Sequence, residues 1–183
     1  TNDQLMAIAE DIISRRQYKI RIMDLDTGKF YPEVIENTSG QIVWANDNKT
    51  LFYVRKHPTT LLPYQVFRHE LGTSPDQDQL IYEEKDTTFY TGIFKTRSDN
   101  LIGIGVSSTM SSEYRFVSAD KPSDAFEVFL PREADHSYSV DHIGDHFYVK
   151  SDYEALNERI WQVADDKVGT KDHWQVLVGH RDD

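Results

Sequence analysis

The sequence predicts an all-β fold in which one antiparallel unit of four short strands is repeated about four times. The first observation is the stretch 41–86, which holds four short runs rich in β-branched and aromatic residues. These runs are 42–44, 51–54, 64–67 and 80–82. Turn-forming residues separate them, leaving two short connections and one longer one. Four strands in about 45 residues is the length of one blade of a β-propeller.

The second observation is that this unit recurs along the chain at intervals of about 45 to 50 residues. Two sets of positions come into register, one in the second strands and one in the fourth: Met6, Phe52, Ile102 and Phe147, and Phe30, Ile81, Val128 and Val176. The loop before each fourth strand carries Asp, usually with Gly or Pro. We therefore predict a single domain over 1–183, with blades at about 1–36, 41–86, 87–131 and 135–179.

The first unit is incomplete, and its opening segment is ambiguous. Within 4–16, five apolar residues fall at helical spacing: Leu5, Ile8, Ala9, Ile12 and Ile13. The repeat instead places 5–9 on a second strand, and 18–24 alternates with the period of two that is typical of strands. We predict strands at 4–10, 17–24 and 30–35, with the first strand of this unit upstream of Thr1.

The last two units complete the pattern, with predicted strands at 89–95, 101–106, 113–117, 125–130, 138–142, 146–150, 158–164 and 174–178. Gly103 and Gly105 form a GxG pair, but a dinucleotide fingerprint would open a helix, so we predict close packing between sheets instead. Trp44 stands between Val43 and Ala45 in a first strand, and we expect it to be largely buried.

Charge and composition narrow the function classes. The chain has 31 acidic and 20 basic side chains, a net charge of −11, which argues against nucleic-acid binding. An acidic surface could attract cationic peptides, although ordinary solubility explains the same charge. The absence of cysteine excludes disulfides and thiolate metal sites, and fits a cytoplasmic location. No apolar run approaches the roughly 18–20 residues of a membrane span, so we expect no membrane partner.

Three Asp–His pairs form the densest polar cluster: Asp135–His136, Asp141–His142 and Asp145–His146. Histidine and carboxylate are common metal ligands. However, the pairs flank the turn of a predicted antiparallel hairpin, where they need not converge. A solvated hairpin rim accounts for the same residues, and we expect neither a metal nor a cofactor.

No catalytic site can be assembled from the sequence. It contains no GxSxG elbow and no cysteine, and the serine pairs 107–108 and 111–112 are explained by turns. The neighbouring carboxylates Glu83–Glu84 and Asp165–Asp166 would point to opposite faces of a strand. We therefore assign no catalytic residue, no cofactor-binding residue and no metal ligand.

Several stretches resemble a known family. They are 14–16 (SRR), 30–33 (FYPE), 44–47 (WAND), 53–58 (YVRKHP), 61–66 (LLPYQV), 68–73, 77–86 and 129–136. Together they resemble the oligopeptidase B (protease II) group of the prolyl oligopeptidase family of serine peptidases. The resemblance covers most of the chain; it is strongest over 41–86 and weakest in the last thirty residues.

The resemblance implies a seven-bladed propeller stacked on an α/β-hydrolase domain, with cleavage of short peptides after Arg or Lys. The catalytic Ser, Asp and His of the family belong to the hydrolase domain, and no stretch here matches them. The chain then represents about four of seven blades, which gate substrate access and are inactive alone. Implied partners are short basic peptides and the hydrolase domain, and open blade faces predict self-association. The alternative is a stand-alone interaction module without peptidase activity.

Overall fold

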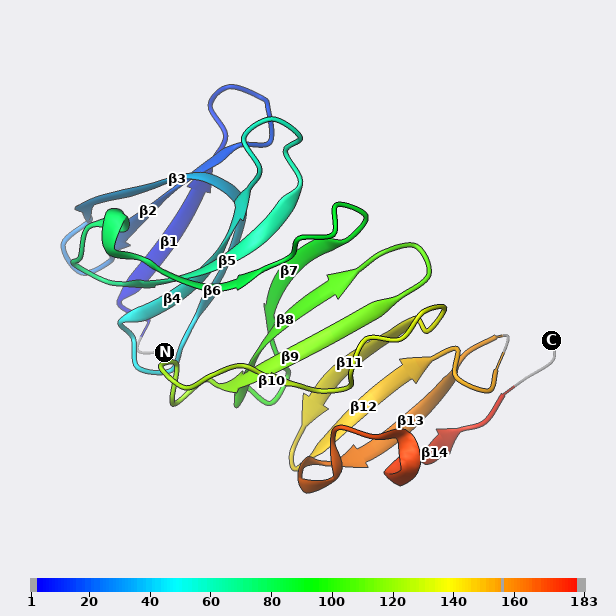
Figure 1. The fold of residues 1–183 in the computed structure, drawn as a ribbon. Coiled ribbons are helices and arrows are strands. Elements are labelled where there is room, and N and C mark those ends of the chain that lie inside the picture. The colour runs from blue at the N-terminus through cyan, green and yellow to red at the C-terminus, as the bar shows by residue number, and fades with distance from the viewer. Residues whose placement is uncertain (1–2, 156, 181–183) are drawn as a thin grey trace.

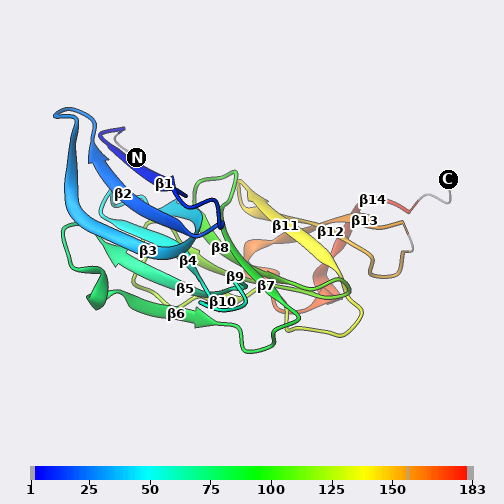
Figure 2. The ribbon, with the colours of Figure 1, turned by 90° about the horizontal axis from the view of Figure 1, so that it is seen from above.

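The computed structural model describes residues 3–155 and 157–180, and this part of the chain contains 14 strands in three antiparallel sheets (Figure 1). The sheets follow one another in chain order, so the first and last strands lie at opposite ends of the row (Figures 1 and 2). The only helices described are three short 3-10 turns: η1 (Pro75–Gln77), η2 (Asp165–Lys167) and η3 (Lys171–His173). None of the described helices has the length or apolar character needed to cross a bilayer.

The first sheet has six strands in sequence order: β1 (Leu5–Glu10), β2 (Tyr18–Asp24), β3 (Lys29–Trp44), β4 (Thr50–Lys56), β5 (Pro63–Glu70) and β6 (Gln79–Glu83). The long strand β3 serves two blades, because its first half pairs with β2 and its second half with β4. Thr38 pairs with Tyr18 on one side and Arg55 on the other. Beside it, Gly40 has a φ of +86°, a conformation that favours glycine.

We call β1, β2 and the first half of β3 blade 1, and the second half of β3 with β4–β6 blade 2. Blade 3 is β7 (Tyr90–Lys95), β8 (Leu101–Ser107), β9 (Ser112–Ser118) and β10 (Glu127–Val128). Blade 4 is β11 (Tyr138–Ile143), β12 (His146–Ser151), β13 (Arg159–Ala164) and β14 (Gln175–Val178). The sequence predicted separate strands at 30–35 and 42–44, whereas one continuous strand spans both.

The segment 4–10, which has helical spacing but was predicted to be a strand, is a strand. β1 pairs with β2 through all six of its residues, and its Ala7 and Ala9 pack on the apolar core between blades 1 and 2. Ile12 and Ile13, which completed the helical pattern, lie in the following loop with exposed fractions of 77% and 61%. Pairing along the sheet therefore outweighs the local helical spacing.

The fourth strand of blade 3 is shorter than predicted. β10 covers two residues rather than 125–130 because the preceding segment is held against blade 2. Arg68 Nη1 donates to the carbonyl of Pro122 at 2.8 Å, and the Phe126 ring meets Phe52 edge-on at 5.5 Å. These contacts direct the chain away from β9 until Glu127.

Three apolar cores lie between the four blades. The core between blades 1 and 2 contains Ile20, Ile22, Ile35, Leu51 and Tyr53. The core between blades 2 and 3 joins Val43, Ala45, Phe52, Val54 and Val66 to Ile93, Ile102, Ile104 and Val106. The core between blades 3 and 4 is aromatic, with Phe116, Phe129, Tyr138, Phe147, Trp161 and Trp174. Face-to-face packing of sheets is the principle by which propeller blades are stabilised.

The glycines of β8 leave room for aromatic rings on the neighbouring strands. Ile102, Ile104 and Val106 point toward blade 2, while Gly103 and Gly105 face the aromatic side. A Cβ at Gly103 would lie 2.9 Å from Phe116 Cε1 and closer still to the ring of Phe94. These rings stand on β7 and β9, the strands that flank β8 in the same sheet, so the GxG pair marks close packing across neighbouring strands and not the packing between sheets that we predicted.

Trp44 is partly buried and packs between blades, but it is more exposed than its neighbours Val43 and Ala45. Strand alternation explains the difference. Val43 and Ala45 point together into the core between blades 2 and 3, with exposed fractions of 8% and 0%. Trp44 points to the opposite face, where it packs on the margin of the first core.

Candidate functional site

The three Asp–His pairs do not come together. His146 is half-buried and bonds its own neighbour, with 2.6 Å between Nδ1 and Asp145 Oδ1. His136 is buried, and its Nε2 lies 2.9 Å from Ser151 Oγ. Among the described residues, no group of three or more His or carboxylate side chains could hold a metal ion. Asp135 and Asp145 are exposed and His146 is half-buried, as a solvated rim requires.

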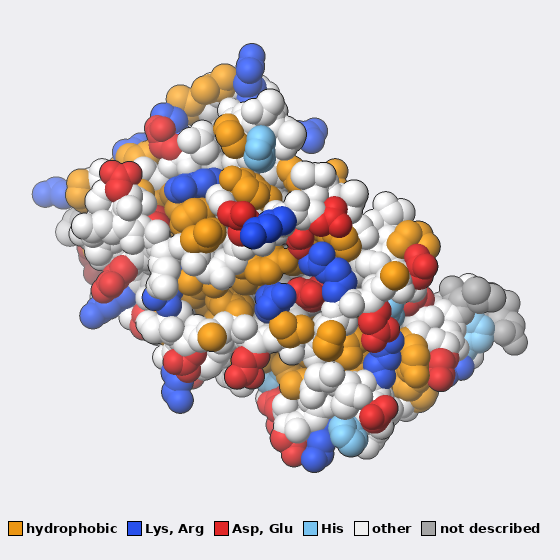
Figure 3. Space-filling view, viewed as in Figure 1, with side chains coloured by type: hydrophobic (Ala, Val, Ile, Leu, Met, Phe, Trp, Pro, Cys, Tyr) orange, Lys and Arg blue, Asp and Glu red, His pale blue; other side chains and the backbone are white. Residues whose placement is uncertain are grey.

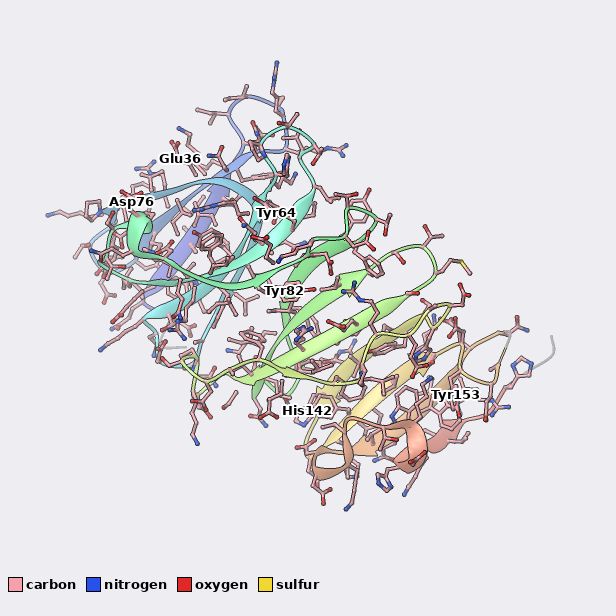
Figure 4. All side chains as sticks on the ribbon, viewed as in Figure 1. Glu36, Tyr64, Asp76, Tyr82, His142 and Tyr153 are labelled. Atoms are coloured by element: carbon pink, nitrogen blue, oxygen red, sulfur yellow. The ribbon has the colours of Figure 1, made fainter. Side chains whose placement is uncertain are left out.

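For His136 and His142 the expectation of a solvated rim was wrong. His142 is 2% exposed because alternation along β11 turns it, with Tyr138 and Val140, into the core against blade 3. Its ring packs on Phe147 with 4.8 Å between centroids. Figure 4 places His142 between blades 3 and 4, which are the second and third sheets.

His142 is the centre of a hydrogen-bonded chain drawn from three elements. Its Nδ1 lies 2.7 Å from Ser98 Oγ in the β7–β8 turn, and its Nε2 lies 2.9 Å from Asp165 Oδ1 at the start of η2. The carboxylate only accepts, so the hydrogen of that bond is on Nε2, and Ser98 faces the other ring nitrogen. This is the serine–histidine–carboxylate order of a hydrolytic triad, with the two ring nitrogens exchanged. The sequence reasoning missed it because Ser98 and His142 are 44 residues apart.

The Ser98 hydroxyl is nevertheless fully engaged. It accepts from the backbone N–H of Asn100 at 3.2 Å and lies 2.9 Å from Thr96 Oγ1. Its own backbone N–H donates to the carbonyl of His142 at 3.0 Å. A nucleophile must instead face a substrate and a set of oxyanion donors. The chain of bonds is therefore a fastening of the β7–β8 turn onto blade 4.

An ion pair extends this fastening. Arg97 Nε lies 3.1 Å from Asp141 Oδ2, and the backbone N–H of Arg97 donates to Asp141 Oδ1 at 3.1 Å. We call Arg97, Ser98, Asp141, His142 and Asp165 the Ser98–His142 clamp. It joins blades 3 and 4 at the turns, beside the aromatic core.

A second clamp joins blades 2 and 3 and is centred on Arg132. Its Nη2 lies 2.5 Å from Glu84 Oε2, and its Nε lies 3.6 Å from Glu113 Oε2. The Tyr82 hydroxyl donates to the same Glu84 oxygen at 2.8 Å, and the Arg132 guanidinium covers the Phe89 ring at 4.0 Å. Tyr82 lies between blades 2 and 3, at the junction of the first and second sheets, in Figure 4. We call Tyr82, Glu84, Glu113 and Arg132 the Arg132 clamp.

The Arg132 clamp shifts the acidity of its members. Burial by itself raises the pKa of Glu84, but hydrogen bonds from Arg132, from the N–H of Asp86 and from Tyr82 bring the net pKa below its ordinary value. Burial raises the pKa of Tyr82, and its hydrogen bond to Glu84 raises it further. The carboxylate is therefore ionised and the phenol neutral at neutral pH.

A third polar cluster is enclosed between blades 1 and 2. His69 is fully buried, with 2.7 Å between Nδ1 and Asp78 Oδ1. The Tyr53 hydroxyl donates to the other oxygen of Asp78 at 2.9 Å, and Glu33 Oε1 lies 3.9 Å from His69 Nε2. Burial, and then the charge of Asp78, raise the pKa of Tyr53. The only sequence signal for this cluster was that Glu33, Tyr53, His69 and Asp78 all lie in stretches that carry the family resemblance.

Polar contacts also join the first strands of blades 2 and 3. The side-chain oxygen of Gln41 on β3 accepts from the backbone N–H of Ile93 on β7 at 3.1 Å. Lys95 Nζ donates to Asn46 Oδ1 at 2.6 Å, and Asn46 Nδ2 donates to Asp120 Oδ1 at 2.7 Å. Each pair of neighbouring blades is thus joined by an apolar core and by polar bridges. The four blades therefore form one continuous row of bonded sheets.

The family follows from comparison with known proteins. Residues 1–183 match the family described as prolyl oligopeptidase, N-terminal beta-propeller domain. The chain belongs to the prolyl oligopeptidase family. The resemblance predicted from the sequence is therefore confirmed, as is the all-β partial propeller.

Individual relatives of the family support the assignment. Dipeptidyl aminopeptidase BI of Pseudoxanthomonas mexicana is 44% identical over 183 residues, which are 100% of this chain and 25% of that protein. Protease 2 of Moraxella lacunata is 31% identical, over 86% of this chain and 23% of that protein. The chain thus spans about a quarter of the length of these curated relatives.

Among solved structures, oligopeptidase B from Leishmania major superposes with a TM-score of 0.93 at 26% identity. The match covers 100% of this chain and 26% of that chain. This prolyl oligopeptidase-family propeller segment therefore folds like the corresponding part of a complete oligopeptidase.

Proposed function

We propose that the chain forms part of the propeller wall of a serine peptidase that cleaves short peptides after Arg or Lys, and that this wall restricts which substrates reach the active site. The observation that carries the proposal is the family match over every residue of the chain. The likeness to oligopeptidase B and to protease 2 supports the Arg/Lys preference.

The physical basis of the restriction is rigidity. Three packed cores and the clamps between blades hold neighbouring sheets together, so an opening bounded by these blades keeps its size. A short flexible peptide can pass such an opening, whereas a folded domain cannot without unfolding. The net charge of −11 favours approach of basic peptides over long distances.

Catalysis itself is proposed to come from an α/β-hydrolase domain outside this segment. The hydrogen-bonded serine–histidine–carboxylate chain Ser98–His142–Asp165 is committed to joining two blades. The chain alone is therefore inactive, and its partner is the hydrolase domain of the same protein. We place that protein in the cytoplasm because a chain without cysteine suits a reducing compartment.

A hydrolysis assay of the natural gene product that carries this segment tests the proposal. It should hydrolyse acetylated peptide amides ending in Arg or Lys and leave the matched Ala amide nearly untouched. A gene product without hydrolytic activity would instead support the stand-alone interaction module, and equal rates on Arg and Ala amides would remove the specificity claim.

A second specificity is favoured by the 44% identity to a protein named dipeptidyl aminopeptidase BI. Such an enzyme releases dipeptides from a free amino terminus. One pair of substrates separates the two readings: the same Arg-containing peptide with a free or an acetylated amino terminus. Cleavage of both supports an endopeptidase, and cleavage of only the free form supports a dipeptidyl aminopeptidase.

We also propose that the 183-residue chain self-associates through its two end faces. The outer face of blade 1 exposes Met6, Phe30 and Val34, and that of blade 4 exposes Ile160 and Val178. In a propeller, blade faces of this kind are apolar because each packs against the face of the next blade. Sedimentation at several concentrations should detect dimers, and one species of about 21.3 kDa at every concentration would contradict this.

A further inference from the structure

A cavity of about 370 Å³ lies between blades 3 and 4, where β10 is short. The rings of Phe116, Phe129 and Phe147 line it, together with Leu101 and Val117. These three rings are in mutual contact, with centroids 5.0 to 6.1 Å apart. The volume is within the range of small-molecule sites in proteins.

Fixed contacts hold the cavity open. β10 pairs only with Arg115 and Phe116 of β9, so the edge of β9 at Val117 is left without a strand partner there. The segment that would have covered this edge is tied to blade 2 through Arg68 and Pro122. On the other side, the N–H of Gly169 donates to the carbonyl of Phe129 at 2.8 Å.

The charged residues of the cavity are mostly acidic. The carboxylates of Asp124, Glu127 and Asp165 line it, against the single ammonium of Lys121. No ion pair is found for Asp124 or Glu127 within the described part of the chain, and both residues are exposed. An aromatic floor beside unpaired carboxylates complements a ligand that is apolar at one end and positively charged at the other.

We propose that this cavity binds a small amphipathic cation, with an aromatic or branched apolar group against the phenylalanines and an amine or guanidine at the carboxylates. Anionic analogues of the same shape are excluded by the three carboxylates. The binding does not depend on peptidase activity, so it stands or falls separately from the proposed function.

The test uses the 183-residue chain and phenylbutylamine, with phenylbutanoate as the anionic match. Nuclear magnetic resonance should detect saturable shifts in the backbone amides of Ser118, Val128 and Val168 with the amine and none with the carboxylate. Ala125→Trp, at an exposed position lining the cavity, should fill the space and abolish the shifts.

Charge is tested separately by two matched double variants. Asp124→Asn/Glu127→Gln should weaken binding of the amine roughly fivefold, given the size of surface charge interactions. Asp26→Asn/Asp76→Asn removes the same charge at exposed positions that do not line the cavity and should leave the affinity unchanged. No binding of the amine at millimolar concentration, equal binding of the carboxylate, or binding that survives Ala125→Trp would each overturn the proposal.

Discussion

The guanidinium of Arg132 and the carboxylate of Glu84 meet at 2.5 Å although 48 residues separate them. Glu84 follows the last strand of blade 2, and Arg132 follows the last strand of blade 3. Their contact ties the outer edges of two blades together and leaves Glu84 9% exposed. It is the polar counterpart of the apolar core between the same two blades.

Replacing Arg132 with Met should lower the free energy of unfolding by about 2–3 kcal/mol, because Glu84 would be left largely buried without its cation, whereas Glu113 keeps Arg115 at 2.8 Å. Lys19→Met breaks the exposed Lys19–Glu36 pair and should cost under about 1 kcal/mol. Urea unfolding of both variants gives the comparison. Equal small losses would show that the Arg132 clamp is not structural.

The contribution of Glu84 should vanish in acid. Its pKa is lower in the folded chain than its ordinary value of 4.5, so its stabilisation is complete above about pH 4.5 and is lost as the pH falls through the folded value. Glu84→Gln should therefore be less stable than the wild type at pH 7, and the difference should shrink as the pH falls through the folded pKa of Glu84. A stability difference that stays constant with pH would contradict this assignment.

Gly103→Ala should destabilise the chain by about 1–3 kcal/mol, since the added methyl group would overlap the rings of Phe94 and Phe116. Shortening the nearer ring should relieve the overlap. We expect Phe94→Leu combined with Gly103→Ala to lose less than the sum of the two single changes. Thermal unfolding of the three variants completes the cycle, and simple additivity would exclude the overlap.

The Ser98–His142 clamp should be structural and not catalytic. Ser98→Ala should lower the free energy of unfolding by about 1–2 kcal/mol, because it leaves the buried His142 Nδ1 without a partner. The 183-residue chain should hydrolyse neither an Arg amide nor an activated ester above background, with or without Ser98. Turnover that is present in the wild type and lost in Ser98→Ala would refute this interpretation.

The strands could be predicted because their signals are local. Alternating apolar residues and the turn residues between them placed β4, β8 and β12 within one or two residues of where they lie. Even β1, whose spacing looks helical, was identified once the repeat was used. The prediction that failed was the solvated rim at His136 and His142. Both faces of an inner blade are covered by neighbouring blades, and the sequence does not show which side chains these neighbours bury.

The clamps and the cavity could not be predicted because they depend on contacts between distant segments. Ser98, His142 and Asp165 belong to different turns and strands, and nothing local marks them as partners. The shortness of β10 follows from Arg68 on another blade. Pro122 and Asp124 were the one local sign that a regular strand would start late.

The central claim is that this segment is a wall that restricts access to a peptidase active site. The direct measurement is kcat/KM of the natural gene product for one Arg-containing sequence, presented first as a short peptide and then within a loop of a folded protein. The account predicts rapid cleavage of the peptide and cleavage of the folded protein at least about a hundredfold slower, a difference of about 2.7 kcal/mol in the barrier. Equal values for the two substrates would contradict it.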